Sequence, residues 1–234
     1  MIVTSPARPG PRILRGALAV YRNNRPGSAP EQLIVFQYNP ESMRRSLATR
    51  TEKASPEEAS DARQDVLQVP GPPVETINLT VELDAADQLE LPSSNDTVAE
   101  HGLHPALAAL ELLMYPDEQQ VEDADAAAER GEAQVYAGDL PLVLLVWGRS
   151  RVVPVKVTGF SVTEEAFDPQ LNPIHAKVDL GLQVLTDLEL PSGTLGFDAY
   201  RAHRRVKGQR AADHFQKPAE GTPGIEDLLR QSRT

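Results

Sequence analysis

Few residues of this chain are of a type and spacing that could do chemistry. His101 and His104 are three positions apart, a spacing that can hold a metal ion on one turn of a helix. Gly102 separates them and Pro105 follows, so we expect both histidines to precede a helix rather than to share one. A capping or surface role is the favoured interpretation, and we predict neither a metal nor a cofactor.

Carboxylates and nucleophiles give no better candidate. Glu164 and Glu165 are adjacent on an expected strand, so they point to opposite faces and cannot work as an acid–base pair. No serine lies in a Gly-x-Ser-x-Gly turn, and no glycine-rich loop follows a strand. The absence of cysteine excludes thiolate catalysis, thiolate metal sites and disulfides. We therefore predict that the protein is not an enzyme.

Charge is divided between two segments of opposite sign. Residues 82–132 hold 14 acidic residues and one basic residue, whereas residues 201–217 hold six basic residues and one acidic residue. Two solvated loops would explain the pattern in a monomer, and complementary surfaces would explain it in a head-to-tail assembly of copies. The candidate interface with a neighbouring protein consists of basic residues of the second segment: Arg201, Arg204, Arg205, Lys207 and Arg210.

Composition argues against two classes of partner. The basic segment is short and the rest of the chain is acidic, so we expect no nucleic acid. The longest apolar run, residues 140–147, is far shorter than the roughly 20 residues of a membrane-spanning helix. We expect no membrane insertion, and we expect synthesis in the cytoplasm because a chain without cysteine needs no oxidising compartment.

The elements that must position these residues are mostly strands. Residues 76–83 and 174–184 alternate between apolar and polar side chains, which predicts strands with one buried and one solvated face. The apolar spacing from Pro105 to Tyr115 predicts one short helix. Five further apolar runs predict strands at residues 13–21, 33–38, 140–147, 151–158 and 160–167. Together with the two alternating segments they bring the expected total to about seven antiparallel strands.

This order of elements predicts a mainly β protein, built as an antiparallel β-sandwich or barrel with one covering helix. We expect the β domain to span residues 12–190, with polar insertions at about 41–73 and 84–138. Residues 191–234 are expected to form a basic, irregular C-terminal extension.

Three motifs, taken together, resemble a known family. Residues 33–43 resemble the hydrophobic strand and Phe-Asn-Pro-Glu-Ser opening of the tube and tube-initiator proteins of contractile injection systems, with Tyr38 in place of the usual Phe. Residues 141–148, which end in Trp-Gly, resemble the buried strand of that family before a Trp-Gly turn. Residues 160–178 resemble its later hairpin, and the likeness spans roughly residues 12–186.

The resemblance implies a structural protein of a phage-tail-like particle, of the tail-tube fold type. Such a subunit would form a homo-hexameric ring, dock on tube, hub or baseplate proteins, and assemble in the bacterial cytoplasm. The long insertions favour a baseplate or tube-initiation subunit, with a repeating inner-tube or cap subunit as the alternative. A LysM-like module commonly follows this domain in the baseplate subgroup, and residues 196–203 keep at most its first helix. A peptidoglycan- or carbohydrate-binding accessory module remains a third possibility.

Overall fold

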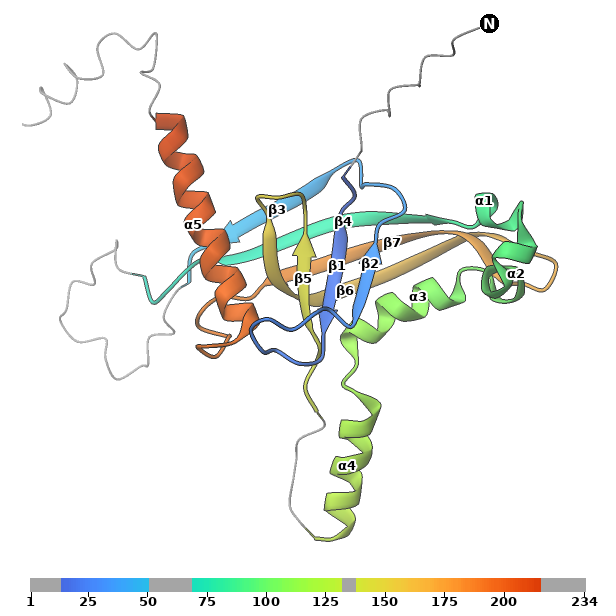
Figure 1. Ribbon diagram of the computed structural model, residues 1–234, viewed down its shortest axis with the longest axis horizontal. Helices are drawn as coiled ribbons and strands as arrows, with labels where there is room; N and C mark the ends of the chain where they lie inside the picture. The colour runs from blue at the N-terminus through green and yellow to red at the C-terminus, as the bar shows by residue number, and fades with distance from the viewer. Residues whose placement is uncertain (1–13, 51–68, 132–137, 216–234) are drawn as a thin grey trace, which may run out of the picture.

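The computed structural model describes residues 14–50, 69–131 and 138–215. Within these ranges seven strands form one antiparallel sheet, in the order β2-β1-β5-β6-β7-β4-β3 (Figure 1). The bounds of the strands are β1 (Ala17–Tyr21), β2 (Gln32–Val35), β3 (Met43–Ala48), β4 (Val74–Asp84), β5 (Leu142–Val146), β6 (Val152–Phe167) and β7 (Pro173–Val184).

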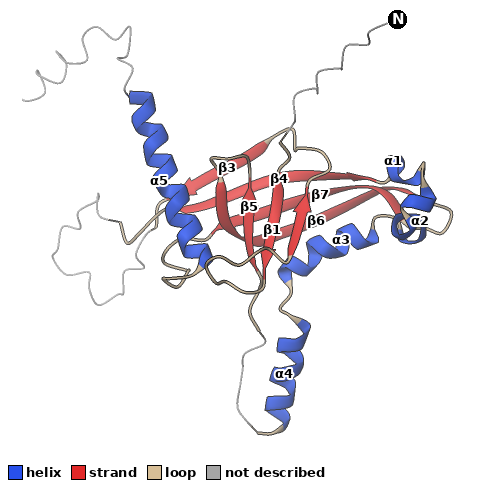
Figure 2. Cartoon of the chain, in the orientation of Figure 1, coloured by secondary structure: helices blue, strands red, loops and turns tan. Residues whose placement is uncertain are grey.

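Strand β6 joins the two parts of the sheet. Its first residues pair with β5, and from Val155 to Phe167 it pairs with β7, with a register shift between Val157 and Gly159. Register shifts of this kind bend a strand and increase its twist. Figure 2 shows how the sheet bends along β6. The short strands β1, β2 and β5 run across the direction of the longer strands β4, β6 and β7.

The core follows from the alternation along β4 and β7. Leu79 faces Leu180 and Val81 faces Val178 across the two strands, and all four side chains are buried. The residues between them, such as Thr80 and Asp179, are exposed. Because side chains alternate along a strand, this sheet has one apolar and one polar face over these strands.

All of the described helices except α5 lie between β4 and β5 in the chain, and α5 follows β7. α3 buries Leu107 and Leu110, and the short helix after it buries Leu113. These side chains belong to the same core cluster as the strands. The bounds are α1 (Ala86–Leu89), η1 (Pro92–Ser94), α2 (Asp96–His101), α3 (His104–Glu111), η2 (Leu112–Met114), α4 (Glu118–Glu129) and α5 (Leu195–Phe215).

The segment between β2 and β3 ties distant parts of the sheet together. Asn39 accepts a hydrogen bond from the backbone N–H of Gly16 (2.8 Å) and donates one to the carbonyl of Leu14 (2.9 Å), just before β1. Gln37 makes the same pair of bonds with the backbone of Asp84 at the end of β4 (2.7 and 2.9 Å). Two amide side chains that are two residues apart therefore connect the start of β1 to the end of β4.

The prediction of a mainly β, antiparallel fold is confirmed, and the expected strand at residues 140–147 is central, as β5. The sheet is not closed in the described residues, since β2 and β3 are its two ends. The two strands expected at 151–158 and 160–167 are one bent strand, β6. The expected helix is present as α3 and η2.

The structure places unexpected elements in three segments, and the irregular C-terminal extension is the expectation that was wrong. The polar insertion at 41–73 contains β3, which pairs with β4 over six residues, while residues 51–68 lie outside the described part. The polar insertion expected at about 84–138 contains α1, η1 and α2 before the expected helix. The extension expected to be irregular contains α5, a helix of 21 residues whose first turns pack on the sheet through Tyr200. The remainder of that extension, residues 216–234, lies outside the described part.

The buried face of β7 gives a first test. Val178→Asp or Leu180→Asp places an unpaired carboxylate where the native side chain is 0% or 1% exposed, and we expect a loss of more than about 4 kcal/mol in unfolding free energy. His175→Ala, on the polar face of the same strand, should cost about 1 kcal/mol or less. Urea unfolding of the three variants measures the difference, and equal losses would mean that the faces are assigned wrongly.

Candidate functional site

The two ends of the sheet are the first candidate interaction surface. In the described residues β2 pairs with β1 alone and β3 with β4 alone, so each leaves a row of backbone groups without a strand partner. On β2, Ile34 packs against the core, whereas Leu33 and Val35 are 58% and 47% exposed. On β3, Leu47 is 54% exposed. Both edges therefore combine open backbone with exposed apolar side chains.

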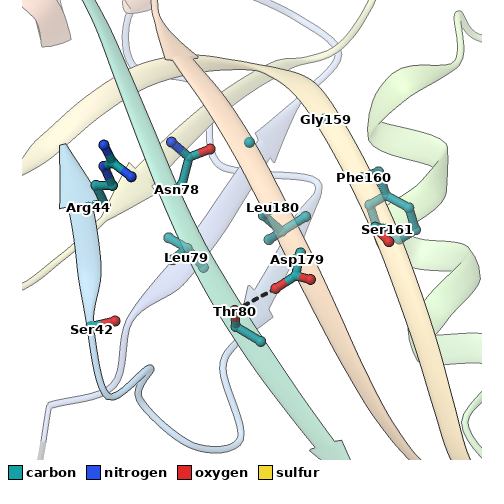
Figure 3. A pocket seen from close by; sticks show the side chains of 11 residues that line it. Ser42, Arg44, Asn78, Leu79, Thr80, Gly159, Phe160, Ser161, Asp179 and Leu180 are labelled. Atoms are coloured by element: carbon teal, nitrogen blue, oxygen red, sulfur yellow. Dashed lines mark hydrogen bonds between the residues drawn. The ribbon is translucent and has the colours of Figure 1, made fainter. Parts of the chain in front are cut away.

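A shallow depression on the polar face is the second candidate (Figure 3). Gly159 of β6 and Gly181 of β7 face each other, and a Cβ on Gly181 would lie 3.3 Å from the backbone nitrogen of Gly159. The absence of two side chains hollows this face. Thr80 donates a hydrogen bond of 2.5 Å to Asp179 beside the hollow. The other polar side chains that line it are Ser42, Arg44, Asn78 and Ser161.

An ion-pair network crosses the same face near the start of β7. His175 lies 2.9 Å from both Glu82 and Glu165, and Lys177 donates to Glu165 at 2.8 Å. The hydrogen bond from Lys177 is the main cause that holds the pKa of Glu165 below its ordinary value, and the same bond raises the pKa of Lys177. Opposite charges on neighbouring strands stabilise a sheet in this way. The four side chains pair with one another across β4, β6 and β7, so the network is a cross-strand brace.

The predicted interface residues all lie on α5, but they differ in the contacts that they make. Arg201 stacks over the ring of Phe197, 5.5 Å from its centroid. Arg204 and Arg205 are exposed. Lys207 turns inward to Glu75, 3.1 Å away on β4 of its own chain, and Arg210 pairs with Asp213 of the same helix at 3.3 Å. Lys207 therefore departs from the expectation that these cations would dock outside the chain.

Sequence reasoning missed a charged cluster under α5. Glu75 is 6% exposed, and its carboxylate accepts hydrogen bonds from both the Nε (2.7 Å) and the Nη2 of Arg45 and from Lys207. Burial alone raises the pKa of Glu75, but the bonds from Arg45 and Lys207 and their positive charges outweigh it, and the pKa lies below its ordinary value. The cluster joins β3, β4 and α5, so it holds the helix on the sheet.

His203 faces the same cluster from α5. Its Nδ1 is buried without a hydrogen-bond partner in the described structure. Burial lowers the pKa of His203, and the nearby charges of Lys207, Arg45 and Arg151 lower it further, against the opposing effect of Glu75. Burial likewise lowers the pKa of Arg151, whose guanidinium donates to the sulfur of Met43 at 3.3 Å.

A signal for this cluster is present in the sequence. Alternation along β4 places Ile77, Leu79 and Val81 on the buried face. Glu75 is two residues before Ile77, so it lies on the same face. A carboxylate at a buried position requires cationic partners. The pattern thus predicts that Glu75 is paired, although the identity of its partners depends on where β3 and α5 lie.

Comparison with models of known protein families finds no match, and no curated protein matches the sequence.

In the described ranges no three His, Asp or Glu side chains gather as metal ligands would. His101 ends α2 and His104 begins α3, so they lie on two different helices. None of the described helices has the length and apolar character required to cross a membrane.

The charged cluster around Glu75 and His203 predicts that the folded protein loses stability in acid, and each of the two residues contributes to the loss. The pKa of His203 is lowered by folding, so protonation favours the unfolded chain once the pH falls below about 6.5, the ordinary value. The lowered pKa of Glu75 contributes stability that is present above about pH 4.3 and is lost as the pH falls through its folded value. Both effects act in the same direction and weaken the attachment of α5.

His203→Gln isolates the first part. The melting temperatures of the parent and the variant are compared at pH 7.5 and about pH 5.5. We expect the parent to lose more on acidification than the variant, because the other four histidines are common to both. A difference between the two proteins that does not change with pH would contradict this account of His203.

Proposed function

We propose that this chain is a structural subunit of a contractile injection, phage-tail-like particle, in the baseplate or at the start of the tube. The observation that carries the proposal is a sheet that is open over the described residues, whose two edges there present unpaired backbone together with exposed Leu33, Val35 and Leu47. Natural proteins protect such edges, because a free edge invites pairing with another chain. Here assembly with neighbours would cover them.

The motifs that resemble the tube family occupy positions on which the fold depends, and this supports the proposal. Asn39 of the first motif fixes the start of β1. Trp147 of the second packs on Gly16, where an added Cβ would lie 2.6 Å from the indole ring. Asp168 of the third accepts the backbone N–H groups of Gln170 and Asn172, both at 2.8 Å, and closes the turn between β6 and β7.

A tail-tube type of β-sandwich or barrel is the finer fold that we propose. Pairing of β2 of one copy with β3 of the next would continue the sheet from subunit to subunit around a homo-hexameric ring. Such a contact joins two different surfaces and closes by rotation, as ring symmetry requires. The polar face of β4, β6 and β7 would then remain available to water or to a neighbouring ring.

Two features favour a baseplate or tube-initiation position over a repeating tube or cap subunit. Helix α4 projects away from the sheet (Figure 1), and α5 adds a long charged element after the last strand. A repeating tube ring needs no such elements, whereas a subunit that joins unlike rings needs additional contacts. Tube, hub and baseplate proteins are therefore the partners that we propose.

A carbohydrate-binding accessory module is the second candidate, and the hollow at Gly159 and Gly181 favours it because Arg44, Asn78 and Asp179 could bond to sugar hydroxyls. Phe160 is the aromatic side chain among the residues that line this hollow. Titration with peptidoglycan fragments, followed by NMR, separates the two candidates. Saturable shifts at these residues would support the glycan module over the structural subunit.

Imaging tests the proposal directly. The chain is produced together with the proteins encoded beside it and viewed by negative-stain electron microscopy. Rings or tail-like particles that contain the chain are the expected result. A monomer that enters no particle would contradict the proposed function.

Variants of β2 test the role of the edge. Leu33→Lys/Val35→Lys replaces two exposed apolar side chains, so we expect the unfolding free energy to change by no more than about 0.5 kcal/mol per site. Assembly into rings or particles should be lost, because charged edge residues oppose strand pairing. Leu91→Lys, a substitution of a 64% exposed leucine between α1 and η1, is the matched control. Normal assembly of the β2 variant would exclude this edge as the interface.

A further inference from the structure

Helix α4 carries a stripe of carboxylates. Residues in an α-helix advance by about 100° each, so side chains four, seven and eleven positions after Glu118 share its face. These side chains are Glu122, Asp125 and Glu129, and all four are exposed. On the opposite side Ala127 is buried, and Gln120 accepts a hydrogen bond from the N–H of Asp139 at 2.7 Å. The acidic stripe therefore faces away from the contacts that hold α4 to the rest of the chain.

The base of α4 is fixed to the sheet, so the stripe has a defined direction. Asp117 caps the helix by accepting the N–H of Gln119 at 2.9 Å, and it also forms an ion pair with Arg22, which follows β1. Arg22 in turn pairs with Glu31 at 3.1 Å. A charged surface that is held in place binds a partner at a lower entropic cost than a mobile one.

Helix α5 carries the opposite charge on its outer side. Tyr200, His203 and Lys207 share the face that packs on the sheet. At about 100° per residue, Arg201 and Arg205 lie on the opposite face, whereas Arg204 lies between the two faces and closer to the packed one. The stacking of Arg201 on Phe197 holds that side chain in place, and a stacked guanidinium still presents its N–H groups at its edge.

One chain cannot bring these two surfaces together. Figure 1 shows α4 and α5 projecting from different sides of the sheet and well separated. Each copy therefore offers one acidic and one basic helix that its own fold leaves apart. A contact between α4 of one copy and α5 of the next joins unlike surfaces, and such a contact can repeat around a ring.

We propose that the acidic stripe of α4 (Glu118, Glu122, Asp125 and Glu129) docks on the outer face of α5 (Arg201 and Arg205) of a second copy of this chain. The inference rests on the proposed function for its head-to-tail order of copies. It adds a second contact to the pairing of sheet edges. Complementary charge of this kind sets the partner and the orientation, and the edges supply the apolar contact.

Cross-linking between copies tests the contact, because the chain has no cysteine of its own. Ala126→Cys lies beside the acidic stripe, and Gly208→Cys lies beside the arginines, where an added Cβ meets nothing within 4 Å. The two single-cysteine proteins carry different tags and are mixed at low salt with a short bismaleimide. We expect at least about fivefold more mixed dimer than from Asp96→Cys, on the exposed start of α2, paired with Gly208→Cys.

Charge reversal and added salt test whether the cross-link depends on attraction between the two charged helices. Glu122→Lys/Asp125→Lys in the first protein, or Arg201→Glu/Arg205→Glu in the second, should reduce the mixed dimer to the control level. The two reversed proteins mixed together should restore it. About 0.5 M salt should also abolish it, since the screening length then falls to about 4 Å.

A yield equal to the control, or one that is indifferent to reversal, would overturn the inference. The result is separable from the proposed function. A charge-dependent cross-link without any ring or particle would refute the proposed function and leave the contact standing. Rings that form while the cross-link stays at the control level would refute the contact alone.

Discussion

The structure depends on a short connection that must link the two opposite ends of one sheet. β2 and β3 are consecutive in the chain, yet they are the outermost strands. Seven strands laid flat would place them about 29 Å apart, at roughly 4.8 Å per spacing. The chain from Val35 to Met43 would reach at most about 29 Å if it were fully extended, and it falls short of this because it bends at Gln37 and Tyr38. The sheet must therefore curl, and the bonds of Gln37 and Asn39 hold it curled.

The curl decides which groups become buried and which become available. It encloses the apolar faces of β4 and β7 against the rest of the core, and it leaves their polar faces and the two edge strands outside. Glu75 is the exception, because it lies on the enclosed side and requires Arg45 and Lys207 to neutralise it. That requirement attaches α5 to the sheet. The same ion pairs therefore determine which arginines of α5 remain on its outer face.

Strands with strict alternation were predictable, because burial on one face alone leaves a period of two in the sequence. β3 was not, since Arg44 and Arg45 stand side by side on opposite faces, one in solvent and one bound to Glu75. α5 was missed for a related reason. Its inner face combines Tyr200 with His203 and Lys207, so the polar residues that pack on the cluster conceal the amphipathic pattern.

The sequence by itself determined that the chain is mainly β, that Val178 and Leu180 are core residues, and that its charge is divided into an acidic and a basic segment. These properties depend on composition and on neighbours along the chain. The tertiary structure alone decided that β2 and β3 are the edges, that Lys207 faces inward while Arg201 and Arg205 face outward, and that α4 and α5 lie on different sides of the sheet. The physical reason is that pairing between strands distant in sequence fixes these positions, and no local pattern records which strands will pair.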